Sequence, residues 1–316
     1  GPRQGFVGTM GGGGENLEGA AAMVAVDDPA SILWLTDRYD RLGLGTATIG
    51  CAVSLAFECY EKGLITKEDT GGLELRWGDA QAAAMLVDMI VARKGIGALL
   101  ADGPKKAAER IGGDASRYAV HIKGVGFNLH DWRGYWQTLL AQAVAGAGPR
   151  WEGISADALG PEPDAGYPKP LPRFAREGAA EAVRRTQMKK LFEDCLGVCR
   201  FTSGRLLGVL GLESRALAAA TGGEPVSVAD MLAVGERIAN LERMFNLRRG
   251  LTPDHDLEVS PRVLEPPADG QSQGKTIAPY LEDMVREYYR LMGWDEVTGR
   301  PEPATLARLG LGHVAT

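Results

Sequence analysis

The sequence predicts a mainly α-helical protein with two domains and few short strands. Its 316 residues are enough for about two domains. In most segments apolar residues recur three and four positions apart and the run ends at a glycine, which is typical of helices and their C-termini. One pattern, D-x-x-G-[LV]-x, occurs twice after such a run, as Asp40-Arg-Leu-Gly-Leu-Gly45 and as Asp194-Cys-Leu-Gly-Val-Cys199.

The first third of the chain is expected to begin with a loop and to continue as helices. Gly8 to Ala22 contains four consecutive glycines but lacks the strand-to-helix context of a phosphate loop. A flexible loop is therefore favoured over a backbone that approaches a cofactor with Glu15 and Glu18 beside it. Capping aspartates and glycine stops predict helices over Asp28 to Leu42, Thr46 to Gly63, Asp79 to Arg93 and, in two short pieces, Ile96 to Ile111. Leu73 to Trp77 is expected to be a short strand or an extended segment.

The rest of the chain is expected to contain one strand, one long loop and further helices. Arg117 to Lys123 has the best strand pattern. Gly146 to Pro172 is rich in proline and glycine and is interpreted as a loop that covers an active site. Helices are expected over Gly134 to Val144, Ala180 to Glu193, Ser214 to Thr221, Ser227 to Asn246 and Ile277 to Met292, and a surface loop over Leu251 to Gly274 that includes the polar triplet Asp254-His-Asp256.

The apolar residues of Ser227 to Asn246 predict which face of that helix is buried. Those that keep helical spacing are expected in the core, and they are Met231, Val234, Ile238, Leu241 and Phe245. Glu236 and Arg243 are then expected on the polar, exposed side.

Composition argues against several functions. The net charge is −6 at pH 7, so nucleic acid is not expected as a partner. The longest apolar run, Ala82 to Ala92, is short and is interrupted by Asp88, so no membrane span is expected. The first residues lack the basic head and apolar stretch of a signal peptide, which favours a cytoplasmic protein. The four cysteines are expected to be reduced, with ligand or core roles, and they lie in two local pairs, Cys51/Cys59 and Cys195/Cys199.

The repeated motif has the chemistry of a paired clamp. In each copy an aspartate lies three residues before a glycine. A carboxylate can accept two parallel N–H donors from a planar, guanidine-like edge such as that of a pterin, and the glycine lets the backbone come close to the bound group. Two copies would suit two pterins. The alternative is two unrelated helix ends with glycine stops.

Two thiols and a polar segment are further candidates. Cys199 ends the second motif and, as thiolate, is a soft ligand for iron–sulfur or for a group 6 metal. Cys51 is expected near the first turn of a helix, where thiolate is favoured, and is either a metal ligand or a small buried residue. Polar residues from His121 to Arg133 could bind an anionic substrate or carry protons. Structural roles are the alternative for each, and Lys123 and His130 are the leading candidates.

The two motifs resemble the paired D-x-x-G-L-x motifs of the aldehyde:ferredoxin oxidoreductase family, which hold a tungsten bis-pterin cofactor. Further stretches that look like this family cover nearly the whole chain, and include Ala56-Phe-Glu-Cys-Tyr-Glu-Lys-Gly-Leu-Ile65, Glu68-Asp-Thr-Gly-Gly-Leu-Glu-Leu75, Ala119-Val-His-Ile-Lys-Gly124, Gly235-Glu-Arg-Ile-Ala-Asn-Leu-Glu-Arg243 and Glu287-Tyr-Tyr-Arg-Leu-Met-Gly-Trp294. Within the family the chain is most similar to the tungsten subunit of class II (ATP-independent) benzoyl-CoA reductase, on the basis of Val26-Asp-Asp-Pro29, Cys51, His130-Asp-Trp-Arg133 and Pro163-Asp-Ala-Gly-Tyr-Pro168.

The resemblance implies the two C-terminal helical domains of the aldehyde ferredoxin oxidoreductase type, here residues 1–121 (family domain 2) and 122–316 (family domain 3). The family's N-terminal β-rich domain and its C-x-x-C-x-x-x-C motif, which gives three ligands to a [4Fe–4S] cluster, have no counterpart in this sequence. The chain is therefore expected to be a fragment or one half of a split enzyme. Its implied partners are the missing domain or split subunit, and an iron–sulfur electron-transfer subunit or ferredoxin.

The resemblance also implies residue roles. Cofactor binding falls to Asp40 and Asp194, with Gly43 and Gly197 allowing the approach, and metal binding to Cys199 for the cluster and Cys51 for tungsten. Either Glu15 or Glu18 would handle protons. From the residue patterns described above, Leu44, Val198 and Lys123 are further candidate cofactor contacts and His130 is a further candidate catalytic residue. The implied cofactors are tungsten bis-molybdopterin and a [4Fe–4S] cluster, with Mg²⁺ as a further candidate ion.

Three functions remain open from the sequence. The first is a reductase that dearomatises an aromatic acyl-CoA such as benzoyl-CoA, the second an aldehyde:ferredoxin oxidoreductase that converts an aldehyde to a carboxylate, and the third a non-catalytic fragment. Aldehyde enzymes of this family tend to carry a histidine in the region that is here Gln137 to Gly148, which has none, and this favours the reductase. A water-poor aromatic pocket is then expected, with Trp132, Trp136, Trp151 and Tyr167 as candidate lining.

Overall fold

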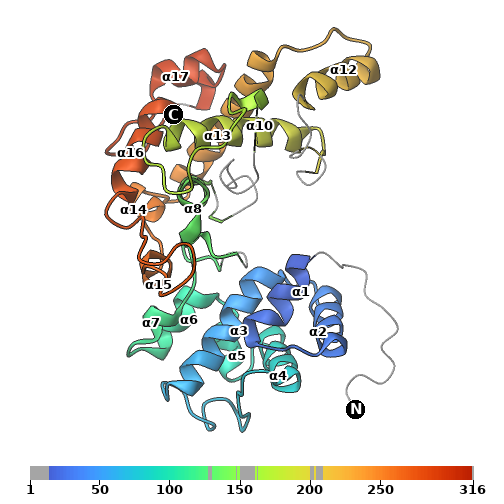
Figure 1. Cartoon of the computed structure of the whole chain (residues 1–316), viewed down its shortest axis with the longest axis vertical. Helices are drawn as coiled ribbons and strands as arrows, with labels where there is room; N and C mark the ends of the chain where they lie inside the picture. Colours follow the sequence, from blue (N-terminus) through green and yellow to red (C-terminus); the bar gives the residue numbers. More distant parts are fainter. Residues whose placement is uncertain are drawn as a thin grey trace. The chain divides into compact units, whose positions relative to one another are not determined.

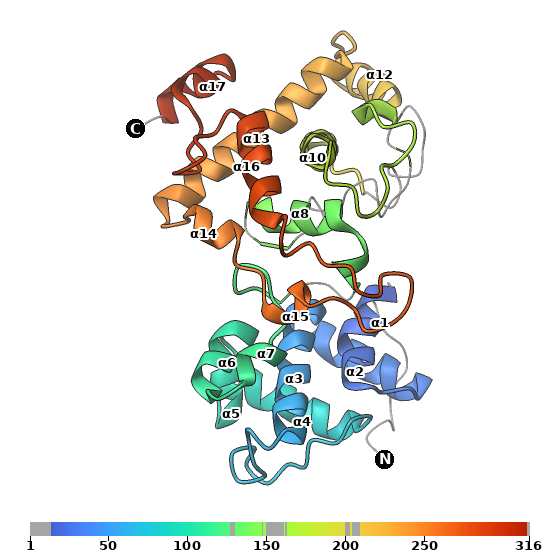
Figure 2. The same ribbon diagram turned by 60° about the vertical axis from the view of Figure 1, so that its left-hand side comes forward.

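The computed structural model describes residues 14–126, 130–146, 148–149, 161, 163–199, 203 and 209–314. It consists of two compact units (Figures 1 and 2). Unit 1 comprises Gly1–Asp131 together with Val259–Glu265, and unit 2 comprises Trp132–Glu258 and Pro266–Thr316. The predicted mainly α class is confirmed, because β structure in the described residues is limited to isolated bridges. The chain changes unit at Asp131, against an expected domain boundary at residue 121.

Unit 1 is built around one central helix, α3 (Thr46–Glu61). Its neighbours are α1 (Gly14–Ala20), η1 (Ala22–Val24), α2 (Pro29–Arg41), α4 (Ala80–Val91), α5 (Ile96–Leu100), α6 (Pro104–Ile111) and α7 (Ala115–Tyr118), with α15 (Pro261–Leu264) added from late in the chain. The core between these helices consists of aliphatic and small residues and two fully buried rings, Tyr39 and Phe57. Alanines and glycines on α3 allow so many helices to approach it closely.

The helix starts in unit 1 follow the capping signals in the sequence. Asp28 accepts a hydrogen bond from the backbone N–H of Ser31 at 2.8 Å, and Pro29 occupies the first helical position of α2. Asp79 accepts from the N–H groups of Gln81 and Ala82 at the start of α4. A side-chain cap satisfies donors that have no intrahelical partner, and the predicted starts are therefore confirmed.

The prediction of a flexible loop over Gly8 to Ala22 was wrong where the structure describes it. Gly14–Ala20 forms α1, while residues 1–13 lie outside the described residues. Two glycines explain how α1 lies against α3. A Cβ atom on Gly50 would stand 2.4 Å from the carbonyl oxygen of Gly19, and one on Gly19 would stand 2.9 Å from the backbone of Thr46. The two helices pack backbone to backbone, which no larger residue would allow.

Unit 2 is built around α10 (Ala179–Cys195), whose neighbours are α8 (Trp136–Val144), α13 (Val228–Arg248) and α16 (Leu281–Met292). The remaining elements are η2 (Trp132–Gly134), η4 (Pro163–Ala165), α12 (Val209–Thr221), α14 (Pro253–Asp256), α17 (Pro303–Arg308) and η5 (Gly312–Val314). The closest approach is between α10 and α13, where a Cβ atom on Gly235 would stand 2.0 Å from the carbonyl oxygen of Met188. Gly235 therefore fixes the crossing of these two helices.

The predicted orientation of α13 is confirmed for Met231, which is fully buried, and was wrong further along the helix. Leu241 and Phe245 are 46% and 57% exposed, whereas Glu236 and Arg243 are 8% and 2% exposed. The polar face is buried because its charges have partners: Glu236 pairs with Arg308 at 2.6 Å, and Arg243 donates to Asp256 at 2.6 Å, to the carbonyl of Gly299 and to the hydroxyl of Tyr289. A buried charge is tolerated when it is paired and hydrogen-bonded.

Two other sequence expectations also failed. Arg117 to Lys123 is not a strand, because Arg117 belongs to α7 and in the rest only Ile122 forms β-bridges, with Val125 and Val259. Leu251 to Gly274 is not simply a surface loop: Asp256 is fully buried, and the stretch contains α14 and α15. Asp256 is buried because Arg243 and Tyr289 lie against it.

Among the described residues, no single helix combines the length and apolar character needed to cross a membrane. One pair, α2 with α3, meets the length and composition test together but is bent by 117°.

Candidate functional site

The first D-x-x-G motif ends α2 in a Schellman turn. Gly43 adopts φ +68°, its N–H donates to the carbonyl of Asp40 at 3.0 Å, and the N–H of Leu44 donates to the carbonyl of Tyr39 at 3.0 Å. This pattern closes a helix with a residue in the left-handed conformation, which glycine adopts without strain. Asp40 is exposed, Leu44 packs against the core of unit 1, and a Cβ atom on Gly43 would meet nothing within 4 Å.

The second motif ends α10 in the same way. Gly197 adopts φ +70°, its N–H donates to the carbonyl of Asp194 at 3.1 Å, and the N–H of Val198 donates to the carbonyl of Glu193 at 3.1 Å. Asp194 is exposed and the space around Gly197 is open. The two copies are therefore one backbone structure made twice, once in each unit.

The turn by itself does not identify a binding site. Gly63, Gly293 and Gly310 end helices with the same pair of hydrogen bonds. What the two D-x-x-G ends add is an exposed carboxylate one turn before an open glycine. The position equivalent to Asp40 is Tyr60, Arg290 or Ala307 at these three ends.

The surroundings of the two carboxylates differ. Asp194 forms an i,i+4 ion pair with the ammonium group of Lys190, whose side chain is buried. Asp40 has no ion pair or side-chain hydrogen bond within the part of the chain that the structure describes. The adjacent guanidinium group, that of Arg41, pairs with Asp37 instead. The sequence analysis missed Lys190, although a lysine four residues before an aspartate on a predicted helix is a recognisable pair.

The cysteines separate into exposed and buried pairs. Cys195 and Cys199, at the second motif, are exposed, while Cys51 and Cys59 are buried. Burial, with a smaller contribution from Glu58, raises the pKa of Cys59 to about 11, so its thiol is protonated and inert, as expected for a structural cysteine. Cys51 is the sixth residue of α3 rather than part of its first turn, and is 1% exposed.

Two of the predicted proton-transfer residues meet in unit 1. The ring Nε2 of His130 lies 2.9 Å from Oε1 of Glu15, although they are 115 residues apart in sequence. Both side chains are partly exposed. Glu15 is in the first turn of α1, where a carboxylate is favoured by the helix dipole. Glu18 lies one turn further along α1, and it has no ion pair or side-chain hydrogen bond within the described ranges.

The stretch from Ile122 to Gly126 contacts α3 through its last residue. Lys123 and Gly124 form the corners of a two-residue turn between Ile122 and Val125, with φ +53° and +75°. Gly126 then packs on α3, where an added Cβ atom would stand 2.8 Å from Cβ of Cys51, and its carbonyl accepts a hydrogen bond from Thr48 at 3.4 Å. A lysine at positive φ is strained. Lys123, Cys51 and the Glu15–His130 pair are thus attached to one local framework formed by α1, α3 and this segment.

Several polar or aromatic candidates have structural roles. The backbone of His121 is tied to Ser260 by two hydrogen bonds, which attach α15 to unit 1. Trp132 and Trp136 are 5% and 6% exposed, and Trp136 packs edge-on against Phe174. Both indoles therefore belong to the packing of unit 2, while Trp151 lies outside the described residues.

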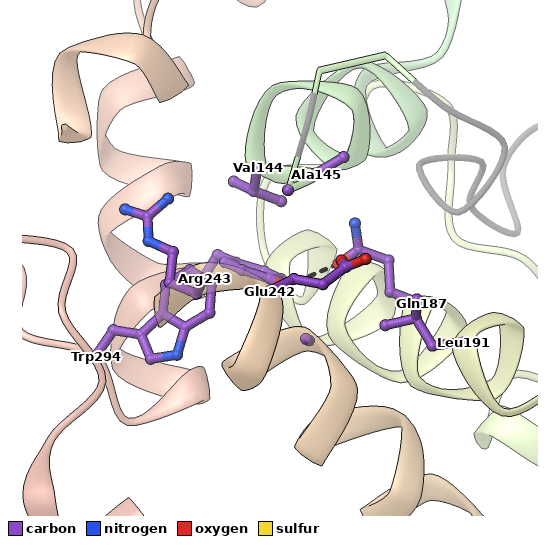
Figure 3. A pocket seen from close by; sticks show the side chains of 10 residues that line it. Val144, Ala145, Gln187, Leu191, Glu242, Arg243 and Trp294 are labelled. Atoms are coloured by element: carbon purple, nitrogen blue, oxygen red, sulfur yellow. Dashed lines mark hydrogen bonds between the residues drawn. The ribbon is translucent and has the colours of Figure 1, made fainter. Parts of the chain in front are cut away.

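One enclosed space in unit 2 lies between α8, α10 and α13 (Figure 3). Its volume is about 20 Å³, and its polar lining includes Gln187, Glu242 and Arg243. The hydroxyl of Tyr288 donates to Oε1 of Gln187 there at 2.8 Å. This space has room for about one water molecule. It is a packing feature and is too small for an aromatic substrate.

Comparison with known proteins identifies the family. A family model described as "Aldehyde ferredoxin oxidoreductase, domains 2 & 3" matches residues 7–311. The chain belongs to this family. The tungsten-containing aldehyde ferredoxin oxidoreductase of Pyrococcus abyssi is 32% identical over 302 residues, which are 94% of this chain and 48% of that protein. The aliphatic sulfonate oxidoreductase, WOR-like subunit, of Pyrococcus furiosus is 31% identical over 92% of this chain and 44% of its own length.

A solved structure has the same fold as this family member. It is the active site complex BamBC of benzoyl coenzyme A reductase in complex with 1,5-dienoyl-CoA, with a TM-score of 0.71 and 23% identity over 94% of this chain and 48% of that chain. The present chain thus spans about half the length of the relatives it matches.

The family implies a tungsten–pterin cofactor, and the described residues fit one. Both motif carboxylates are exposed, and both motif glycines have open space where a planar group could approach. Asp40 and Asp194 would hold pterin edges, and the exposed thiol of Cys199 is accessible to a metal. Within the described residues, no group of three or more histidine, cysteine, aspartate or glutamate side chains could hold a metal ion.

Proposed function

We propose that this chain is the helical part of a tungsten bis-pterin, [4Fe–4S] oxidoreductase that reduces the ring of an aromatic acyl-CoA such as benzoyl-CoA. When bound, the metal–pterin group would supply electrons at low potential. The chain's own contribution would be to hold the pterins at Asp40 and Asp194, to hold one corner of the cluster at Cys199 and to deliver protons. The family assignment supports the cofactor, and the Glu15–His130 contact carries the proposal for the protons.

Ring reduction needs protons at a defined place, and a carboxylate joined to an imidazole is suited to deliver them. An imidazole can both donate and accept a proton, and Glu15 Oε1, which lies 2.9 Å from Nε2 of His130, orients the ring. The imidazole is placed by its contact with Glu15 on α1, and α1 packs on α3, the helix that also carries Cys51. We assign proton transfer to His130, with Glu15 as its partner. Cys51 stays the candidate tungsten ligand.

The alternative is an aldehyde:ferredoxin oxidoreductase, and the names of the tungsten-containing relatives at 31–32% identity favour it. Against it stands the stretch from Gln137 to Gly148, which contains no histidine. Its helical part, α8, is buried throughout and places the neutral side chains of Gln137 and Gln142 in the interior. These amides do not titrate, so they would not serve as the base for aldehyde oxidation.

The test uses the enzyme assembled from this chain and its missing half. With a viologen dye as electron partner, we expect turnover of benzoyl-CoA-like thioesters in preference to free aldehydes. Rapid aldehyde oxidation without thioester turnover would rule out the reductase.

A pair of matched variants tests the proton assignment in the same assay. Glu15→Gln removes the carboxylate that contacts His130 and should lower turnover by about 10²-fold or more. Glu18→Gln, one turn along the same helix, should have a much smaller effect. Equal losses in the two variants, with tungsten content unchanged, would contradict the assigned role of Glu15.

A further inference from the structure

Unit 2 contains a buried cluster of charged side chains next to the Asp194 motif. Glu193 precedes Asp194 on α10 and is fully buried, and Glu213 on α12 is 7% exposed. The buried ammonium group of Lys189 lies 3.3 Å from Oε1 of Glu193. Asp164 of η4 lies at the start of α12, where it accepts a hydrogen bond from the N–H of Leu210 at 3.0 Å. Two buried carboxyl groups and the partly buried Asp164 thus lie near the ammonium group of Lys189.

Glu213 is the member of this cluster whose negative charge would be least stabilised by hydrogen bonds. It lies three residues after Leu210 and so occupies the same face of α12. Neither of its carboxyl oxygens has a hydrogen-bond partner among the residues that the structure describes. An ionised carboxylate in that position is costly, whereas the neutral acid is tolerated. The geometry therefore favours a proton on Glu213.

Burial and the neighbouring carboxylates act on Glu213 in the same direction as the missing hydrogen bonds. Burial first, then Glu193, and more weakly Asp164, raise the pKa of Glu213 to about 7, while Lys189 opposes them. On the side of α13, the apolar side chain of Met231 belongs to the same buried cluster as Leu210 of α12. Both protonation states of Glu213 are accordingly accessible near neutral pH.

The cluster is connected to the surface motif through α10. The last turns of this helix carry two parallel i,i+4 pairs, Lys189 with Glu193 in the interior and Lys190 with Asp194 at the motif. The members of the two pairs are sequence neighbours, so a change of charge at Asp194 alters the potential at the buried cluster, where screening by water is weak.

We propose that Glu213, together with Glu193 and Lys189, is a proton-binding site whose occupancy responds to the charge at the Asp194 motif. The bound species is a proton from solvent, which forms an O–H bond on Glu213 and leaves again as the carboxylate ionises. No redox step is involved, and the site does not depend on the substrate proposed above. It would allow unit 2 to take up a proton when negative charge is added at the motif.

The test is a titration of the full chain without cofactor, with the carboxyl carbons of glutamate isotopically labelled and observed by NMR. One signal should titrate with a midpoint near pH 7. It should disappear in Glu213→Gln and remain in the control Glu224→Gln, which alters an exposed glutamate. The wild-type titration is informative even if Glu213→Gln folds poorly. A Glu213 signal that is ionised at every pH above about 5 would overturn the proposal.

Two further variants test the coupling by its sign. Lys190→Met removes a positive charge beside the cluster and should raise the midpoint of Glu213, whereas Asp194→Asn removes a negative charge and should lower it, each by about half a pH unit. Shifts in the same direction, or no shift in either variant, would show that the cluster is isolated from the motif.

Discussion

The Asp40 and Asp194 motifs have the same backbone and different electrostatic surroundings. Asp40 follows Tyr39, whose burial raises its phenol pKa so far that the ring stays neutral. Asp194 follows Glu193, which belongs to a buried charged cluster, and is itself paired with Lys190. The first motif continues into Gly45 and α3, while the second ends at the exposed thiol of Cys199.

This difference shows that a repeated motif need not be a repeated environment. An isolated carboxylate at Asp40 can give both oxygens to a guanidine-like edge. At Asp194, one oxygen is already engaged by an ammonium group, so a ligand there must share the carboxylate or displace Lys190. The helix end fixes the position of the carboxylate and the glycine, and the adjoining side chains determine the local charge at the ligand.

The largest expected effect concerns the thiol that only the second motif has. In the assembled enzyme, Cys199→Ser should remove or destabilise the [4Fe–4S] cluster, because an alcohol is a poor replacement for a thiolate on iron. Cys195→Ser, at an equally exposed position four residues earlier, is the control and should keep the cluster. Iron content and visible absorption measure both, and the reverse result would show that the motif is misaligned with the family.

The next effect concerns the charged cluster, which has no counterpart beside Asp40. The pKa of Glu213 in the folded chain is raised to about 7, so its stabilising contribution is complete below the unfolded value of about 4.3 and is lost as the pH rises through about 7. Glu213→Gln should remove this loss. The free energy of unfolding of the variant, relative to that of wild type, should therefore be higher at pH 8 than at pH 5 by up to about 3 kcal/mol.

Urea unfolding of unit 2, followed at both pH values, measures this gain, with Glu224→Gln as the matched control. If the difference in unfolding free energy between Glu213→Gln and wild type is the same at pH 5 and pH 8, the pKa of Glu213 is not raised.

A smaller effect tests the shared backbone. Gly43→Ala and Gly197→Ala place a side chain at φ +68° and +70° without any steric clash, so each should destabilise its unit by about 1 kcal/mol through backbone strain alone. Gly312→Ala is the control, since it also has open space but no left-handed φ. Clearly unequal losses at Gly43 and Gly197, measured by denaturant unfolding, would mean that the two turns are not equivalent.

The smallest expected effect is a difference in the sign of the stability change when each motif carboxylate is replaced by an amide. A negative charge near a helix C-terminus is unfavourable, so Asp40→Asn should stabilise the chain without cofactor by about 0.3 kcal/mol. Asp194→Asn also breaks the pair with Lys190 and should destabilise it by about 0.5 kcal/mol, since half-exposed pairs contribute little. Thermal unfolding of both variants at low salt gives the comparison. Stabilisation by Asp194→Asn would indicate that the ion pair makes no net contribution.

Local features of the fold were predictable from the sequence. Asp28 and Asp79 begin helices because their caps involve neighbouring residues, and Gly43 and Gly197 end helices because only glycine readily adopts the required φ. For the same reason the two motifs could be found from their spacing alone. The Lys189–Glu193 and Lys190–Asp194 pairs were equally local and could have been read from the sequence.

Features that depend on distant partners were not predictable. Arg243 is buried because Asp256, Tyr289 and Gly299 supply its partners, and no local pattern contains that information. Arg117 to Lys123 has the residues of a strand but finds no strand to pair with. The Glu15–His130 contact and the position of Glu213 beside Glu193 likewise arise from contacts between elements that are separate in the sequence. The candidate site could thus be listed from the sequence, but its groupings required the fold.

The attachment of α15 has a consequence for the order of events during translation. Ser260 and Arg262 contact His121 and Glu58, which lie 139 and 204 positions earlier. On the ribosome, these contacts of unit 1 can therefore form only after most of unit 2 has been synthesised. Until then, Ser260 and Arg262 are not available to His121 and Glu58. Contacts between such distant positions form slowly. The contact of Arg262 with Glu58 is thus one of the last to form in unit 1. If synthesis stops before Arg262, unit 1 lacks this contact.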